Sequence, residues 1–251
     1  MKKRAILFTK SSLLGVSLTV LVLAATVLPA WAAAPQPEIL HYTADMSLCK
    51  DVGSATVSLR EVGKDKFEGV IESQTNGIVA AFTAHRRDRY ATTMQMVQGK
   101  LQPLLYIEES RVGKKHLYKE YRFDYGRRKL ELWRRSKDGV MVLKWETELT
   151  QPIYDPISAL YNFRIGALGE VKAGNTLSVA GIPYPHPETM TIQLGSQEPN
   201  NRQATVILRS RPGEDQIGQI YARFDDKLVP LDAWTHVALF GRISGRLVSR
   251  N

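Results

Sequence analysis

Histidine and cysteine are the side chains most suited to acid–base, nucleophilic or metal chemistry, and this chain has few of either. The histidines do not pair with one another, or with carboxylates, at the spacing of a helical metal site; they are His41, His85, His116, His186 and His236. The sequence also lacks the Gly-x-Ser-x-Gly motif of serine hydrolases. We therefore expect no catalytic residue, no metal and no cofactor.

Two of these residues allow a second interpretation. Cys49, next to Lys50, is expected to be a buried small apolar residue, and a reactive or intermolecular thiol is the alternative. His186 lies in the Pro-rich segment 182–188 and is expected to be an exposed loop residue. Because strands can assemble a site from residues far apart in sequence, catalysis stays open as the less favoured hypothesis.

Residues 111–137 hold eleven cations against three carboxylates, interleaved with aromatic side chains. In a cytosolic protein this mixture would favour nucleic acid, but for an exported chain we expect an anionic membrane surface or cell-wall polymer instead. The alternative is a solvated outer face whose lysines discourage strand pairing at an edge. The candidate anion-binding residues are Arg122, Arg127, Arg128, Arg134 and Arg135.

The first 32 residues are typical of a secretory signal peptide. Four cations precede the apolar run 13–28, and Ala30 and Ala32 are the small residues of a cleavage site. Cleavage predicts a periplasmic protein of one β-rich domain, residues 33–251, whose net charge falls from +9 to +5. An uncleaved inner-membrane anchor is the alternative, because the apolar run is nearly long enough to span a bilayer.

Most of residues 33–251 alternate apolar and polar side chains, as half-buried strands do, and turn residues separate the runs. Many short strands without helices between them predict a mainly β fold, either a curved antiparallel sheet or a (half-)barrel. The expected strands span residues 39–48, 55–62, 66–74, 78–84, 104–112, 116–125, 129–135, 140–149, 176–181, 189–194, 203–210 and 219–224, with two closing segments.

Residues 154–164 break this pattern and predict one short amphipathic helix. Asp155 can accept hydrogen bonds from the first turn, and Pro156 fits the first helical position. Packed on the concave face of the sheet, the helix is either a plug that fills the interior or a lid over a cavity. Four residues share one side at helical spacing: Ile157, Leu160, Tyr161 and Arg164.

Two expected strands carry large apolar side chains at alternate positions. Tyr121 and Phe123 share one face of segment 116–125, and Met141, Leu143 and Trp145 share one face of segment 140–149. An interior of this composition suits a packed core or a pocket for acyl chains. The candidate ligand-binding residues of the helix and the concave face are Ile157, Leu160, Tyr161, Arg164, Tyr121, Phe123 and Trp145.

The segment Tyr-Asp-Pro-Ile-Ser-Ala-Leu-Tyr, residues 154–161, followed by Arg164, closely resembles the signature of exported proteins called the domain of unknown function 3108 family. Residues 99–106, the pair Phe123-Asp124 and a closing hairpin with Pro230 and Gly245 resemble that family too. The resemblance covers most of the mature chain. It implies an exported, curved antiparallel β protein, similar in shape to half-barrels that carry lipoproteins or lipids, and no established activity.

Together these features favour a non-catalytic envelope protein that binds a hydrophobic or amphipathic ligand, lipid or lipoprotein-like, in a curved sheet. The alternative is a structural or assembly partner of an envelope protein complex, with a solid core and its function on its surface. An enzyme is the third hypothesis. The first two differ in one physical property, because a filled interior leaves no room for a ligand.

Overall fold

The computed structural model describes residues 34–182, 187–198, 201–208, 218–237 and 241–251. All of them belong to one compact unit, Ala32–Asn251. The expected signal peptide, residues 1–32, and the loop residue His186 lie outside the described residues. Within the described part of the chain, no helix has both the length and the apolar character needed to cross a membrane.

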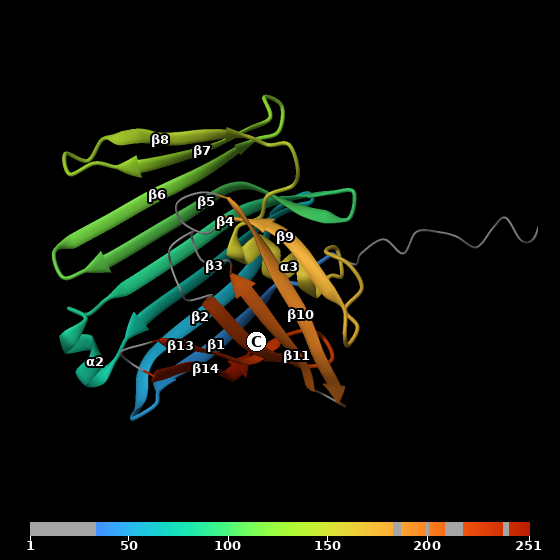
Figure 1. Cartoon of the computed structure of the whole chain (residues 1–251). Helices are drawn as coiled ribbons and strands as arrows, with labels where there is room; N and C mark the ends of the chain where they lie inside the picture. Colours follow the sequence, from blue (N-terminus) through green and yellow to red (C-terminus); the bar gives the residue numbers. More distant parts are fainter. Residues whose placement is uncertain (1–33, 183–186, 199–200, 209–217, 238–240) are drawn as a thin grey trace, which may run out of the picture. The chain divides into compact units, whose positions relative to one another are not determined.

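The described residues form fourteen strands and two helices (Figure 1). In chain order they are β1 (Glu38–Met46), β2 (Cys49–Gly63), β3 (Lys66–Thr75), α2 (Gly77–Phe82), β4 (Arg87–Val97), β5 (Lys100–Val112), β6 (Lys115–Asp124), β7 (Lys129–Arg135), β8 (Met141–Glu148), α3 (Pro156–Arg164), β9 (Thr176–Gly181), β10 (Glu188–Glu198), β11 (Asn201–Leu208), β12 (Gly218–Phe224), β13 (Pro230–Val237) and β14 (Gly241–Arg250).

All fourteen strands join one antiparallel sheet, in the order β8-β7-β6-β5-β4-β3-β2-β1-β14-β13-β12-β11-β10-β9. The sheet consists of two meanders, β1–β8 and β9–β14, which are joined where the first and last strands pair. Its edges, β8 and β9, do not pair with each other, so the sheet stays open. The predicted mainly β fold with a curved antiparallel sheet is therefore confirmed.

Helix α3 lies in the connection between the two edge strands and packs against both meanders. It contacts β3, β4 and β5 on one side and β9 on the other. Ile157 and Tyr161 belong to the apolar core of the first meander, whereas Ala159 and Phe163 belong to the core of the second. The sheet thus bends around α3, and the face that α3 covers is the concave one (Figure 1).

Local signals fix both ends of α3. The Asp155 carboxylate accepts hydrogen bonds from the N–H groups of Ile157 (2.9 Å) and Ser158 (3.1 Å), as its capping role predicts. Gly166 follows the helix with φ 74°, and its N–H bonds to the Phe163 carbonyl. This left-handed glycine ends the helix in a Schellman arrangement. The predicted start of the helix at Asp155 and Pro156 is confirmed.

The strand predicted at residues 78–84 is wrong, because this segment forms α2. β3 and β4 pair directly with each other, so the segment between them is a connection outside the sheet. Gly77, with φ 55°, turns the chain away from β3, and Ala80 N–H then bonds to the Asn76 carbonyl. A short apolar run without a clear period does not distinguish a strand from a helix.

The predicted common face of Met141, Leu143 and Trp145 is also wrong. A register shift between Leu132 and Trp133 pairs Trp145 with Leu132 and Leu143 with Trp133. Because neighbouring residues of β7 point to opposite faces, Trp145 faces the core while Leu143 faces outward.

Candidate functional site

Asp155, the cap of α3, is fully buried between the helix and the sheet. Its second carboxylate oxygen accepts a hydrogen bond of 2.9 Å from the hydroxyl of Thr92 on β4. Burial raises the pKa of this carboxyl, and the hydrogen bonds from Ser158, Thr92 and Ile157 act in the opposite direction. Asp155 therefore fixes the start of α3 on β4 rather than facing a ligand.

Asn162 fixes the last turn of α3 on the first residues of β5. Its side-chain oxygen accepts a hydrogen bond from Leu101 N–H (2.9 Å), and its amide nitrogen donates to the Leu101 carbonyl (2.7 Å). The same nitrogen donates to the Ser158 carbonyl. The fully buried amide thus pairs with the backbone of Leu101 as a neighbouring strand would.

Arg164 ties the end of α3 to β1. Its guanidinium forms a bidentate ion pair with Glu38, and the Tyr161 hydroxyl donates to the same carboxylate at 3.1 Å. The two charged side chains are only 12% and 14% exposed. Three polar side chains thus hold α3 on the sheet: Asp155 on β4, Asn162 on β5 and Arg164 on β1. The most distinctive segment of the sequence is therefore a structural anchor.

The seven candidate ligand-binding residues lie in or beside this packed interior. The side chains of Ile157, Tyr161, Tyr121 and Phe123 are buried in the first core cluster, and Trp145 packs against it. Leu160 packs against the second cluster. Around these residues α3 has the contacts of a plug rather than those of a lid.

The rest of the concave face, toward α2, is hollow. A pocket of about 530 Å³ lies there between β1, β2, β3, β14, α2 and the start of β4, and we call it the inner pocket. Ala55 on β2 lines it and shares its side of the strand with Leu59, which belongs to the core cluster around Ile157. The inner pocket and α3 therefore occupy two halves of one face.

Small side chains make room for the inner pocket. Ala44 pairs with Gly53 on one side and with Gly245 on the other, and Ala55 pairs with Ser73. These five residues form a floor across four neighbouring strands, and all of them line the pocket. The largest side chain of this floor is the hydroxymethyl group of Ser73, so the floor leaves space above the sheet.

The walls of the inner pocket are mostly apolar. They include Tyr42 and Met46 from β1, Ile243 from β14 and Val79 from α2. The Tyr42 hydroxyl donates to the Pro230 carbonyl at 2.9 Å, so this hydroxyl is already used within the protein. Burial raises the pKa of Tyr42, which keeps the phenol neutral.

One charged pair borders the inner pocket. Arg86 donates from Nε to both oxygens of Asp88, at 2.8 and 3.1 Å, and this hydrogen bonding raises the pKa of Arg86. Ser110 donates to the same carboxylate at 2.5 Å. The Arg86 side chain is 48% exposed while that of Asp88 is 13% exposed, so the cation is the more accessible partner.

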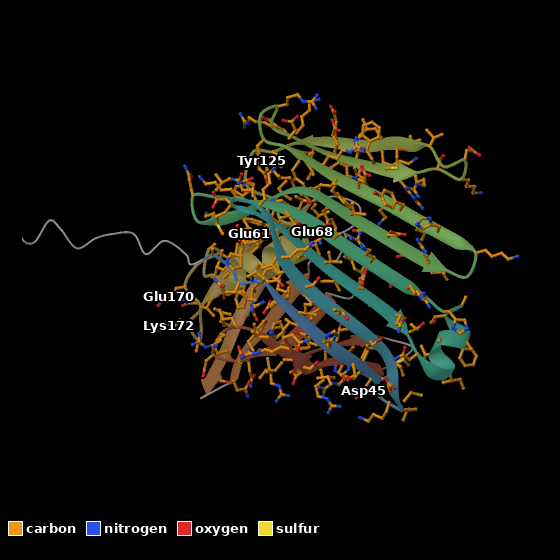
Figure 2. The ribbon with its side chains drawn as sticks, turned by 180° about the vertical axis from the view of Figure 1, so that it is seen from behind. Asp45, Glu61, Glu68, Tyr125, Glu170 and Lys172 are labelled. Atoms are coloured by element: carbon orange, nitrogen blue, oxygen red, sulfur yellow. The ribbon has the colours of Figure 1, made fainter. Side chains whose placement is uncertain are left out.

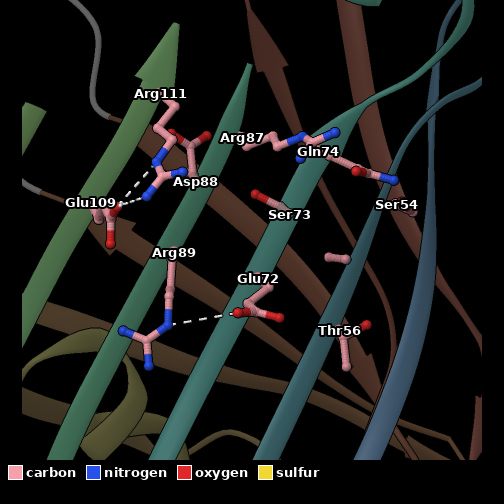
Figure 3. Close-up of a pocket in the computed structure, with 11 residues that line it drawn as sticks. Ser54, Thr56, Glu72, Ser73, Gln74, Arg87, Asp88, Arg89, Glu109 and Arg111 are labelled. Atoms are coloured by element: carbon pink, nitrogen blue, oxygen red, sulfur yellow. Dashed lines mark hydrogen bonds and ion pairs between the residues drawn. The ribbon is translucent and has the colours of Figure 1, made fainter. Parts of the chain in front are cut away.

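The opposite face of the sheet carries a polar groove of about 440 Å³, which we call the outer groove (Figure 3). Thr56, Glu72, Arg89 and Glu109 stand side by side on β2 to β5 along its floor. Arg89 pairs with Glu72 at 3.6 Å, and Arg111 pairs with Glu109 at 2.9 Å. Because the lining of the outer groove is mostly polar and two of its three arginines already have carboxylate partners, it is a weaker candidate for a site of an apolar ligand than the inner pocket.

The candidate anion-binding arginines do not share one face. Arg122 and Arg135 lie on the outer face, and their guanidinium carbons are 4.8 Å from the Trp133 ring centre and 4.3 Å from that of Tyr118. Arg134 takes the opposite face of β7, because neighbouring residues of a strand alternate.

The other two arginines follow β6 in the turn before β7. Arg127 pairs with Asp124 at 2.6 Å, and Arg128 pairs with Glu148 at 3.1 Å. Arg122 also has a carboxylate partner, Glu120, at 2.6 Å. Three of the five candidate charges are therefore balanced locally, as on a solvated surface.

The sequence interpretation missed the residues of the inner pocket. Ala44, Gly53, Ala55, Ser73 and Gly245 are ordinary small residues, and they lie on four different strands. Their common position emerges only from the strand order and register. The one available signal was the apolar segment at residues 78–84, for which the sequence predicts a strand.

Among the described residues, no group of three His, Cys, Asp or Glu side chains is placed to hold a metal ion. Cys49 is half-buried at the start of β2 and pairs with Met46 across the turn. On the outer face, Nε2 of His116 lies 2.9 Å from the Glu109 carboxylate, which also pairs with Arg111.

Comparisons with known proteins agree with this fold. A crystal structure titled as a β-barrel-like protein of the domain of unknown function DUF1849, from Brucella abortus, superposes with a TM-score of 0.56 at 11% sequence identity. The similarity covers 86% of this chain and 97% of that one, and it concerns the fold alone. No curated protein matches the sequence significantly. The profile of the family described as "Protein of unknown function (DUF3108)" matches residues 41–204, so the resemblance is confirmed and the chain belongs to this family.

Proposed function

We propose that this protein is an exported, non-catalytic binding protein of the cell envelope that holds a hydrophobic or amphipathic ligand in the inner pocket. The observation that carries the proposal is an apolar hollow of about 530 Å³ beside a well-packed plug, on the same concave face. Its volume lies within the range of roughly 300–1,000 Å³ found for small-molecule pockets. The signal-peptide pattern of residues 1–32 supports the exported location.

The lining determines the class of ligand. An acyl chain would lie on the floor formed by Ala44, Gly53 and Ala55, where it removes apolar surface from water. Arg86 stands at the border of the inner pocket with about half of its side chain exposed. It can donate to an acidic or hydroxylated head group while it keeps its bond to Asp88. We therefore favour a single-chain amphiphile with an oxygen-rich head.

An assembly partner of an envelope complex is the second candidate, and one observation favours it. Among the strands that the structure describes, the edge strand β8 pairs only with β7, and its residues Val142 and Leu143 are 39% and 40% exposed. An unpaired edge strand can accept a strand from another protein. The filled interior around α3 suits either candidate, but the hollow toward α2 has no role in a purely structural protein.

Native mass spectrometry tests the proposal directly. The full-length gene product would be secreted by a Gram-negative host through its own leader, purified without detergent and sprayed under native conditions. We expect an adduct of one amphiphile per chain, which organic extraction then releases for identification. A protein that carries no stoichiometric amphiphile, both as purified and after refolding with total envelope lipid, would contradict ligand binding.

A further inference from the structure

Several turns and α2 meet at one end of the sheet, which we call the α2 end. Strands β1, β3, β5 and β13 finish there, and β2, β4, β6 and β14 begin there, because all neighbours are antiparallel. Asp45 lies at this end, whereas Glu61 and Glu68 lie at the opposite one (Figure 2). The inner pocket lies toward the α2 end, because Met46, Thr83 and Ile243 line it.

The three most exposed large apolar side chains of the described chain all lie at the α2 end. Leu48, in the turn between β1 and β2, is 97% exposed. Phe82 and Ile78, both on α2, are 83% and 65% exposed and stand one helical turn apart. Exposed apolar side chains gathered in one place mark a site of contact with a partner or a membrane.

Cationic side chains surround these apolar residues. Lys50 is 87% exposed, two residues after Leu48. Exposed Lys114 lies in the turn between β5 and β6, and exposed Lys115 is the first residue of β6. This turn contacts the segment that follows α2, because Gly113 N–H bonds to the Ala84 carbonyl at 2.9 Å. Exposed Arg87 follows α2 by five residues.

The carboxylates at the α2 end are mostly engaged within the protein. Asp45 accepts a hydrogen bond of 2.8 Å from Asp51 N–H and pairs with Lys50 at 3.5 Å. Asp88 is held by Arg86. Asp51 is exposed and accepts only a long hydrogen bond, 3.4 Å, from Asn76. Asp45 offsets the charge of Lys50, so the positive charge of this end comes from Lys114, Lys115 and Arg87. The surface therefore combines protruding apolar groups with more exposed cations than exposed carboxylates.

We propose that the α2 end is the surface by which this protein docks on an anionic lipid bilayer, from which the inner pocket takes up or to which it delivers its amphiphile. The inference rests on the proposed function. Single apolar side chains that protrude from a turn and a short helix suit insertion between lipid head groups better than a flat protein interface. Lysines beside them are attracted by anionic head groups.

Co-sedimentation with lipid vesicles tests the docking surface. We expect the mature protein to bind vesicles of phosphatidylglycerol and phosphatidylcholine more tightly than vesicles of phosphatidylcholine alone. The double variant Ile78→Ser/Phe82→Ser should lose roughly tenfold or more in affinity, because two apolar side chains no longer enter the bilayer. Lys114→Glu/Lys115→Glu should weaken binding only to the anionic vesicles.

Val248→Ser is the matched control, because Val248 on β14 is also an exposed apolar residue (62%). It lies away from the turn between β1 and β2, since its neighbour Leu247 pairs with Tyr42. This variant should bind vesicles as the unaltered protein does. Equal binding by the Ile78→Ser/Phe82→Ser variant, or no binding of the unaltered protein to either vesicle, would overturn the docking proposal. A stable complex with an envelope protein that the same double variant abolishes, without vesicle binding, would also overturn it.

The variant Ala55→Phe separates the two proposals, because it fills the floor of the inner pocket and leaves the α2 end unchanged. It should retain vesicle binding while it loses the amphiphile. If the unaltered protein carries an amphiphile but does not bind vesicles, the docking proposal fails and ligand binding stands. If it binds vesicles but never carries an amphiphile, ligand binding fails.

Discussion

Asp155 combines the roles of helix cap and cross-element hydrogen-bond acceptor. One carboxylate oxygen accepts from two N–H groups of the first turn of α3, and the other accepts from Thr92 of β4. A cap on the protein surface would have water as a substitute partner, whereas Asp155 has none because it is fully buried. The residue therefore contributes to the stability of both α3 and its contact with the sheet.

Substitution of Asp155 measures this contribution. We expect Asp155→Ala to lower the free energy of unfolding by about 1–3 kcal/mol, because it removes the cap and leaves Thr92 and the first-turn N–H groups without their acceptor. Asp155→Asn should lose less, since asparagine caps helices as well as aspartate does. Equal losses in both variants, measured by urea unfolding, would contradict the capping role.

The same residue predicts a pH dependence. Burial raises the folded-state pKa of Asp155 above its usual value of about 3.8, so the folded protein binds this proton more tightly than the unfolded chain does. Its contribution to stability is complete below about pH 3.8 and declines as the pH rises toward the folded-state pKa. The difference in unfolding free energy between the unaltered protein and Asp155→Asn should therefore fall with rising pH. A difference that grows with pH would show that the hydrogen bonds outweigh burial.

At the scale of elements, α3 requires a glycine opposite it on β3. A Cβ added at Gly69 would lie 2.5 Å from Cγ2 of Ile157, a separation that no packed pair tolerates. The absence of a side chain at Gly69 lets the buried Ile157 approach the sheet. The position of α3 on the sheet thus depends on this close contact as well as on its polar anchors.

A double-mutant cycle checks the contact. Gly69→Ala alone should destabilise by about 1–3 kcal/mol through overpacking, and Ile157→Ala alone by about 2–5 kcal/mol through the lost apolar contact. Because Ile157→Ala removes the atom that clashes, the double variant should lose less than the sum of the two. Additive losses would show that α3 does not lie on β3 as described.

The sequence predicted elements well where local chemistry determines them. Alternation predicted most strands, and Asp155 with Pro156 predicted the start of α3. It failed at α2, where six apolar and small residues have no period, and at β8, where an extra residue, Lys144, changes the face. Long-range pairing decides such cases, because only the neighbouring strands show that segment 77–82 is a connection.

At the scale of the whole molecule, one concave face is divided between a plug and a hollow. The anchors of α3 were visible in the sequence as a motif, but the inner pocket was not. Its floor needs Ala44, Gly53 and Gly245 to meet from the two chain ends, and this meeting depends on the pairing of β1 with β14. A pocket that exists because small residues from separate strands leave space has no local signature in a single sequence.

Titration with an environment-sensitive fluorescent fatty acid tests the central claim, that the inner pocket holds an amphiphile. Ala55→Phe fills the floor, whereas Thr56→Phe, the next residue of β2, places the same ring on the outer face. We predict saturable one-to-one binding by the delipidated protein and by Thr56→Phe, and a loss of roughly tenfold or more in Ala55→Phe, with all three proteins equally folded by circular dichroism. Unchanged binding in Ala55→Phe, or no saturable binding by the unaltered protein, would contradict the account.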